Sequence, residues 1–180
     1  MESQKNISLA HTKILKTLSN LPVKMLTAHH HEKLSDLVLY ELAHPNCFNF
    51  LKVAFIVDNP NFQCLHGVTG FNKNEYQPLN QTSAWDNTES FHKALEQSPF
   101  HQKVRSIRQC GTTKPTHKEP EKLKELAENL TFEQPSFYTW QMKHENYGIL
   151  LFEHEDATTA DPYDTELLQG LSLLGFCPIY

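Results

Sequence analysis

The sequence predicts a single α+β domain built around an antiparallel β-sheet. Two stretches rich in β-branched and aromatic residues, "FLKVAFIVDNPNFQCLHGVTG" and "SFYTWQMKHENYGILLFE", each contain a turn signal between two strand-like runs, which is typical of a β-hairpin. The two ends of the chain instead carry apolar side chains at helical spacing. With 180 residues, of which 39% are apolar, the chain is long enough to bury a sizeable core.

Two helices are expected before the first hairpin. The first covers residues 7–21, where Pro22 interrupts the apolar stripe, and the second covers residues 24–43 and ends at "HPN". We therefore divide the chain into an amino-terminal lead-in, residues 1–23, and a main domain, residues 24–180.

The rest of the chain alternates loops with short elements. A long polar loop over residues 70–88 precedes a short helix at residues 89–97, a brief strand within residues 101–109 and a helix at residues 121–129. After the second hairpin, a closing helix begins at "DPYD" and carries apolar residues at spacings of four and three. The sheet should therefore contain five to six strands.

The register of the first hairpin follows from its turn. Counting back from the four-residue turn places Phe55 opposite Cys64, and Val53 opposite His66. One apolar face of the second strand would then carry a thiol and an imidazole.

Charge and cysteine usage exclude several classes of protein. Sixteen Lys and Arg against 21 Asp and Glu give a net charge of −5, which disfavours nucleic-acid binding. No apolar run reaches the roughly 20 residues that span a bilayer, and the amino terminus lacks the apolar core of a signal peptide. We expect a cytoplasmic protein without membrane insertion, in which all four dispersed cysteines are free thiols: Cys47, Cys64, Cys110 and Cys177.

Local motifs give no support for catalysis. The chain contains no GxSxG, GxGxxG, GxxxxGK or HExxH pattern. The three histidines at positions 29–31 are consecutive, so they cannot face one another on a helix, and no metal site is expected. The cofactor, if the protein uses one, stays unknown.

The order of the elements resembles the GAF family of small sensory domains over residues 24–176. The two quoted hairpins resemble the first and last hairpins of that family, with Gly148 where a glycine often begins the final strand, and "DPYDTELLQGLSLL" resembles its closing helix. The resemblance implies that the amino- and carboxy-terminal helices pack on one face of the sheet. Loops and short helices would then enclose a ligand pocket on the other face.

The resemblance also implies which residues line that pocket. Trp85 is a candidate lid, because an indole in a polar loop is expected to fold inward. The sheet face carrying the thiol and the imidazole would form one wall, and the penultimate strand could extend it. The candidate ligand-binding residues are Phe55, Cys64, His66, Trp85, His92, Trp140 and Met142. Ordinary core packing is the alternative for each of them.

These observations favour a non-catalytic regulatory domain. It would bind an unidentified small molecule and signal through its terminal helices to an output module such as a cyclic-dinucleotide synthase, a histidine kinase or a transcription regulator. A homodimer through the same helices is also expected. Two alternatives stay open: an interaction module whose pocket is filled by its own side chains, and a thiol-based redox enzyme related to free methionine-sulfoxide reductases. The redox enzyme would need two cysteines within about 7 Å between Cα atoms.

Overall fold

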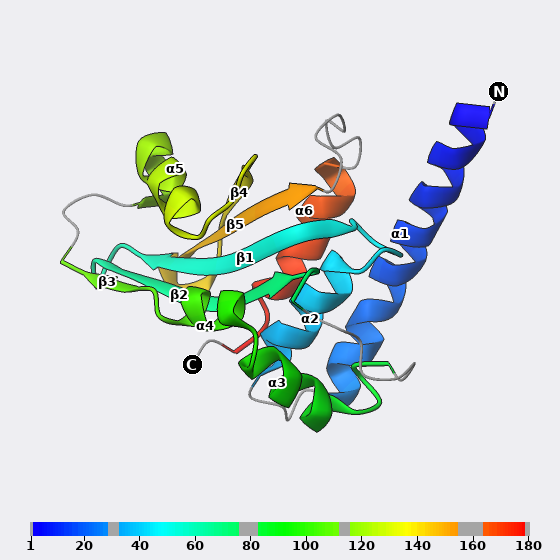
Figure 1. Ribbon diagram of the computed structural model, residues 1–180, viewed down its shortest axis with the longest axis horizontal. Helices are drawn as coiled ribbons and strands as arrows, with labels where there is room; N and C mark the ends of the chain where they lie inside the picture. Colours follow the sequence, from blue (N-terminus) through cyan, green and yellow to red (C-terminus); the bar gives the residue numbers. More distant parts are fainter. Residues whose placement is uncertain (1, 29–32, 76–82, 112–115, 155–163, 179–180) are drawn as a thin grey trace.

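The computed structural model confirms an α+β fold with an antiparallel sheet (Figure 1). It describes residues 2–28, 33–75, 83–111, 116–154 and 164–178. The five strands are β1 (Phe50–Asn59), β2 (Cys64–Asn72), β3 (Arg108–Cys110), β4 (Ser136–Gln141) and β5 (Tyr147–His154), in the order β3-β2-β1-β5-β4. The helices are α1 (Glu2–Thr27), α2 (Leu34–Ala43), α3 (Thr88–Glu96), α4 (Pro99–Arg105), α5 (Pro120–Asn129) and α6 (Asp164–Leu174), with short 3₁₀ turns η1 (Thr116–Lys118) and η2 (Lys143–Glu145).

The terminal helices cover one face of the sheet, as expected. Phe55 of β1 lies in one buried apolar cluster with Leu37 of α2 and Leu171 of α6. A Cβ atom added at Gly170 of α6 would lie 2.8 Å from a methyl carbon of Leu42 in α2, so these two helices pack closely. Figure 1 shows α1 on the outside of this layer, with its amino-terminal end projecting beyond its neighbours.

Helices α4 and α5 cover the opposite face. Ile56 and Leu151 of the sheet pack in a second buried cluster with Val104 of α4 and Leu126 of α5. Helix α4 approaches β2 so closely that a Cβ atom at Gly67 would lie 1.8 Å from the carbonyl oxygen of Val104. The described side chains therefore form a packed apolar layer on this face.

The expected break at Pro22 is wrong, because α1 continues through this residue. The buried residues of α1 recur at spacings of four and three on both sides of the proline: Ile14, Leu18, Leu21 and Met25. A proline inside a helix costs about 3 kcal/mol, and burying several large apolar side chains recovers more than that. The expected domain boundary after residue 23 thus falls inside one continuous helix.

The expected register of the first hairpin is also wrong. His66 pairs with Val57, and Cys64 with Asn59, while an irregularity after Phe55 places that residue opposite Thr69. The turn comprises residues 60–63 rather than 58–61, so the pairing next to it shifts by four residues, and the irregularity between Phe55 and Ile56 shifts it by one more. The pairing shifts by an even number of residues near the turn, so Cys64 and His66 still point to the same face as Phe55.

The remaining expectations have mixed outcomes. Residues 99–105 form a helix rather than part of a strand, because Ser98 caps it and Pro99 occupies its first turn. The second hairpin and the helix near residues 121–129 are confirmed. The closing helix is confirmed from Asp164 onward, while its "DPY" start lies outside the described residues. None of the described helices has the length and apolar character needed to cross a membrane.

Candidate functional site

The face that was expected to line a pocket is covered by the terminal helices instead. Phe55 is fully buried in the cluster formed with α2 and α6, and its ring stacks on Trp140 at 5.6 Å between ring centroids. His66 is half-buried and lies opposite Val57, another member of that cluster. The placement of this face toward the loop side is therefore wrong, because the apolar terminal helices require a large apolar partner surface.

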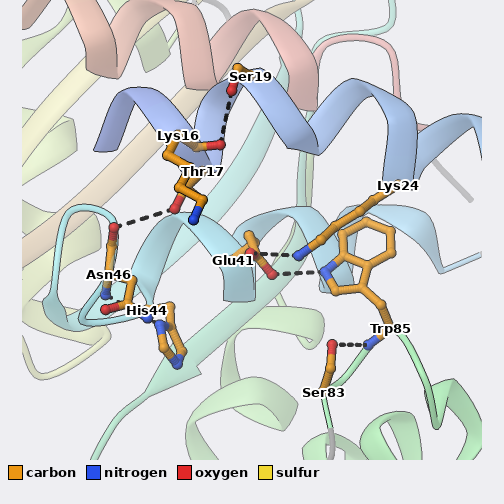
Figure 2. A network of polar contacts seen from close by, with 9 residues as sticks. All are labelled: Lys16, Thr17, Ser19, Lys24, Glu41, His44, Asn46, Ser83 and Trp85. Atoms are coloured by element: carbon orange, nitrogen blue, oxygen red, sulfur yellow. Dashed lines mark hydrogen bonds and ion pairs between the residues drawn. The ribbon is translucent and has the colours of Figure 1, made fainter. Parts of the chain in front are cut away.

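Trp85 binds to the helices rather than covering the expected pocket. Its indole Nε1–H donates to Glu41 Oε2 of α2 at 2.8 Å, and Lys24 of α1 donates to the other oxygen of the same carboxylate at 2.8 Å (Figure 2). The Lys24 ammonium also lies 5.6 Å from the centre of the Trp85 ring, a cation–π distance. This network links the segment before α3 to both amino-terminal helices.

The remaining candidates lie at separate places. Trp140 and Met142 pack against the helix-side cluster, and the Trp140 ring occupies the space where Gly148 lacks a Cβ atom. His92 of α3 lies with its Nε2 3.9 Å from Asp36 Oδ2. The structure thus brings Phe55 and Trp140 together and places His92 next to a carboxylate that sequence reasoning did not single out. Ligand binding by these residues stays a prediction.

A pocket with mostly polar lining residues opens where α2, α4 and β2 meet. Its volume is about 330 Å³, and its walls come from segments far apart in the sequence. The lining residues are Lys33, Ser35, Asp36, Val68, Glu96, His101, Gln102, Arg105 and Pro178. A cavity of this volume is at the lower end of the range for small-molecule sites. We call it the α2–α4 pocket.

Two ionisable groups of the α2–α4 pocket are strongly perturbed. Burial raises the pKa of Asp36 to about 6, against the opposing effects of a hydrogen bond from Thr69 and of the nearby Arg105 charge. Burial also lowers the pKa of His101 to about 4, although the contact of its ring with the backbone at Gly70 opposes this. Perturbed groups that face a cavity are typical of binding sites.

The guanidinium of Arg105 is placed to meet an anion in the α2–α4 pocket. It donates to the carbonyl oxygen of Val68 at 3.0 Å. Among the described residues, no carboxylate forms an ion pair with it. Lys33 and Glu96 form an ion pair on the same wall. The pocket therefore offers cationic and anionic groups together.

A disulfide occupies one end of the sheet. Cys64 and Cys110 lie directly opposite each other on β2 and β3, with 4.2 Å between their Cα atoms, and are joined by a disulfide. The expectation of four free thiols is therefore wrong for this pair. The pair lies 46 residues apart in sequence without a CxxC motif, so only the fold reveals it.

A buried hydrogen-bonded cluster that the sequence did not reveal connects η1 to the sheet. Asp58 Oδ2 accepts two hydrogen bonds from His117, from its backbone N–H and from its ring Nδ1, each at 2.9 Å. The His117 ring stacks on Tyr147 with 3.6 Å between centroids. Asp58 is the next-to-last residue of β1, at a position where an aspartate usually indicates the coming turn, so local sequence contains no distinct signal of this contact.

Comparison of the chain with protein-family models, with curated proteins and with solved structures found no match. Function is therefore inferred below from the geometry of the α2–α4 pocket and of the disulfide.

Proposed function

We propose that the protein is a cytoplasmic, non-catalytic regulatory domain that binds a small molecule in the α2–α4 pocket and signals through its terminal helices. The observation that carries this proposal is the buried Asp36 carboxyl facing the same cavity as the Arg105 guanidinium. A ligand with a cationic and an anionic group, such as a small amino acid, would pair with both. The pairing would be strongest at Asp36, because this carboxyl is buried whereas Arg105 is exposed.

The position of α2 supports a route for the signal. Asp36 lies in the first turn of α2, while Leu42 at the other end of this helix contacts Gly170 of α6. Glu41 of the same helix binds Lys24 of α1. A ligand that favours one position of α2 would therefore shift the population of arrangements of α1 and α6, to which an output module would be attached.

Native mass spectrometry of freshly purified protein tests the proposal. We expect a co-purifying small molecule on the wild-type chain that is lost from Arg105→Ala. Lys103→Ala is the matched control, because Lys103 is an exposed cation of the same helix that does not line the α2–α4 pocket. The proposal fails if every form carries only the bare mass and a panel of free amino acids leaves the melting temperature unchanged.

An interaction module that forms a homodimer through α1 is the second candidate. Leu9 and Val23 are 59% and 62% exposed. They lie fourteen residues apart, almost four helical turns, so they share the face of α1 that points away from the core. A groove between α1 and α6, lined in part by Leu15 and Leu173, lies beside this face. The apolar packing on both faces of the sheet also favours this candidate, since such a module needs no internal cavity.

A further inference from the structure

The disulfide between Cys64 and Cys110 lies at an exposed edge of the sheet. Strand β3 is the edge strand, has three residues and is exposed along its whole length. Cys110 is its last residue and is exposed, while Cys64 is half-buried. Exposed disulfides are the ones that external thiols reach and exchange with.

The other two cysteines differ from this pair. Cys47 and Cys177 are buried, and burial raises the pKa of each thiol to about 12. Only the thiolate is the reactive form, so neither residue should take part in thiol exchange near neutral pH. Thiol chemistry among the described residues is therefore confined to Cys64 and Cys110.

Two basic residues accompany the disulfide on one side of the sheet. His66 pairs with Arg108 in the β2–β3 ladder, next to the Cys64 and Cys110 pair. Residues two apart in a strand point to the same face, so all four side chains share one side. A guanidinium and an imidazole beside a disulfide favour the thiolate that forms when it opens, and the positive charge attracts anionic thiols.

We propose that Cys64 and Cys110, flanked by His66 and Arg108, form a redox-active dithiol–disulfide site that exchanges with small anionic thiols of the glutathione class. Disulfides in a reducing cytoplasm are generally transient, so the cytoplasmic location proposed above requires such exchange. The site is separate from the α2–α4 pocket and goes beyond ligand binding there.

The exchange has two balanced steps. The thiolate of the small thiol attacks the exposed Cys110 sulfur, the protein disulfide breaks, and Cys64 leaves as a thiolate that takes up a proton. A second small thiol then attacks the mixed disulfide on Cys110, which releases the oxidised small disulfide and leaves Cys110 as a thiol. Two electrons pass from two small thiols to the protein, and an excess of the small disulfide reverses both steps.

The full chain, equilibrated in mixtures of reduced and oxidised glutathione at pH 7, tests the proposal. Samples are quenched with acid, denatured, alkylated with N-ethylmaleimide and weighed as intact protein. We expect two populations that interconvert around one midpoint, with four alkylated thiols when reduced and two when oxidised. Peptide mapping should assign the change to Cys64 and Cys110. Cys47→Ala should keep the two-thiol step, and Cys110→Ser should abolish it.

Two results would overturn the proposal. One is a protein in which Cys64 and Cys110 stay alkylated at every glutathione ratio. The other is a disulfide that survives in 100% reduced glutathione, at about 10 mM, until the chain is denatured, as expected of structural disulfides with very negative potentials.

The contribution of Arg108 is tested by reduction rates. Removing one charge near the attacked sulfur should slow reduction of the oxidised protein by glutathione about threefold. Arg108→Ala should slow reduction by 2-mercaptoethanol less, because that thiol carries no carboxylate groups and only its thiolate and the leaving Cys64 thiolate meet the charge, and Lys103→Ala should leave both rates unchanged. Unchanged rates with both thiols would show that the Arg108 charge does not act on the attacked disulfide and would remove Arg108 from the site.

Discussion

At the scale of single residues, the α2–α4 pocket holds two buried groups whose protonation affects stability in opposite directions. The pKa of Asp36 is raised from 3.8 to about 6, so the folded protein binds this proton more tightly than the unfolded chain. The pKa of His101 is lowered from 6.5 to about 4, so the folded protein binds that proton less tightly. Each shift corresponds to about 3 kcal/mol when fully expressed.

We predict opposite pH dependences for the two variants that remove these groups. As the pH falls from 7 to 4, wild-type protein gains stability from protonation of Asp36, so the stability of Asp36→Asn relative to wild type should fall. Over the same range, wild-type protein loses stability because the unfolded chain protonates His101, so the relative stability of His101→Gln should rise.

Urea denaturation at pH 7, 5.5 and 4 measures both effects. The difference in unfolding free energy between each variant and wild type reports on the substituted group. The other charged groups around Asp36 are the same in both proteins: Lys33, His92, Glu96 and Arg105. Parallel stability curves for wild type and both variants would contradict the assignment of perturbed groups to this pocket.

At the scale of elements, two glycines of β2 determine how closely α4 packs on the sheet. A Cβ atom at Gly67 would lie 1.8 Å from the backbone oxygen of Val104, and one at Gly70 would lie 2.6 Å from a side-chain carbon of Val104. A backbone atom can move only with its helix, whereas a methyl group can be removed by substitution.

We therefore predict that both alanine substitutions destabilise the fold but that only one can be rescued. Gly67→Ala should lower the free energy of unfolding by about 3 kcal/mol, because α4 must shift. Gly70→Ala should also destabilise the protein, and adding Val104→Ala should recover part of the loss in the Gly70 background alone. Thermal and urea denaturation of the single and double variants measure this. Equal rescue in both backgrounds would mean that the Val104 side chain, not the helix backbone, sets the spacing.

The elements themselves were largely predictable, and their junctions were not. Both hairpins and the helix near residues 121–129 follow from local alternation or helical spacing, so the sequence indicated them correctly. The continuation of α1 through Pro22 depends on burial against other elements, which local propensity does not contain. The same holds for the register of the first hairpin, which depends on where the turn falls and on the irregularity after Phe55.

The candidate site was less predictable for the same reason. Asp36, Val68, His101 and Pro178 meet only in the folded chain, and none belongs to a local motif. The one available signal was a charged residue on an otherwise apolar helix: Asp36 lies within "LSDLVLYELA", between leucines that are buried. A carboxylate on a helix face that is apolar and buried indicates a polar partner nearby.

At the scale of the whole molecule, the layers leave the outer face of α1 without a described partner surface. The sheet is covered on one side by α1, α2 and α6, and on the other by α4 and α5. Leu9 and Val23 point away from both clusters and are mostly exposed. If the homodimer forms through α1, this face is its centre.

The homodimer makes a direct prediction. Val23→Glu should shift the protein from dimer to monomer, because two carboxylates would be brought together in an apolar interface. Size-exclusion chromatography with light scattering measures the mass of the assembly over a hundredfold range of loaded concentration, about 1 to 100 μM. Lys103→Glu, a new acid on the opposite layer, should leave the mass unchanged. A wild-type mass of one chain at every concentration would exclude the homodimer.

Because α1 is long, a small movement of the core would produce a larger displacement at the amino-terminal end of this helix. Near the amino-terminal end of this helix, His11 forms a hydrogen bond with Glu166 of α6 at 2.7 Å. The nine residues of α1 that precede His11, from Glu2 to Ala10, extend the helix by about 14 Å at 1.5 Å per residue. If α1 tilted by about 10° around His11, its amino-terminal end would move by about 2 Å, about half the spacing between neighbouring Cα atoms. An adjustment too small to alter the packing of the sheet would therefore be magnified at the end of the helix.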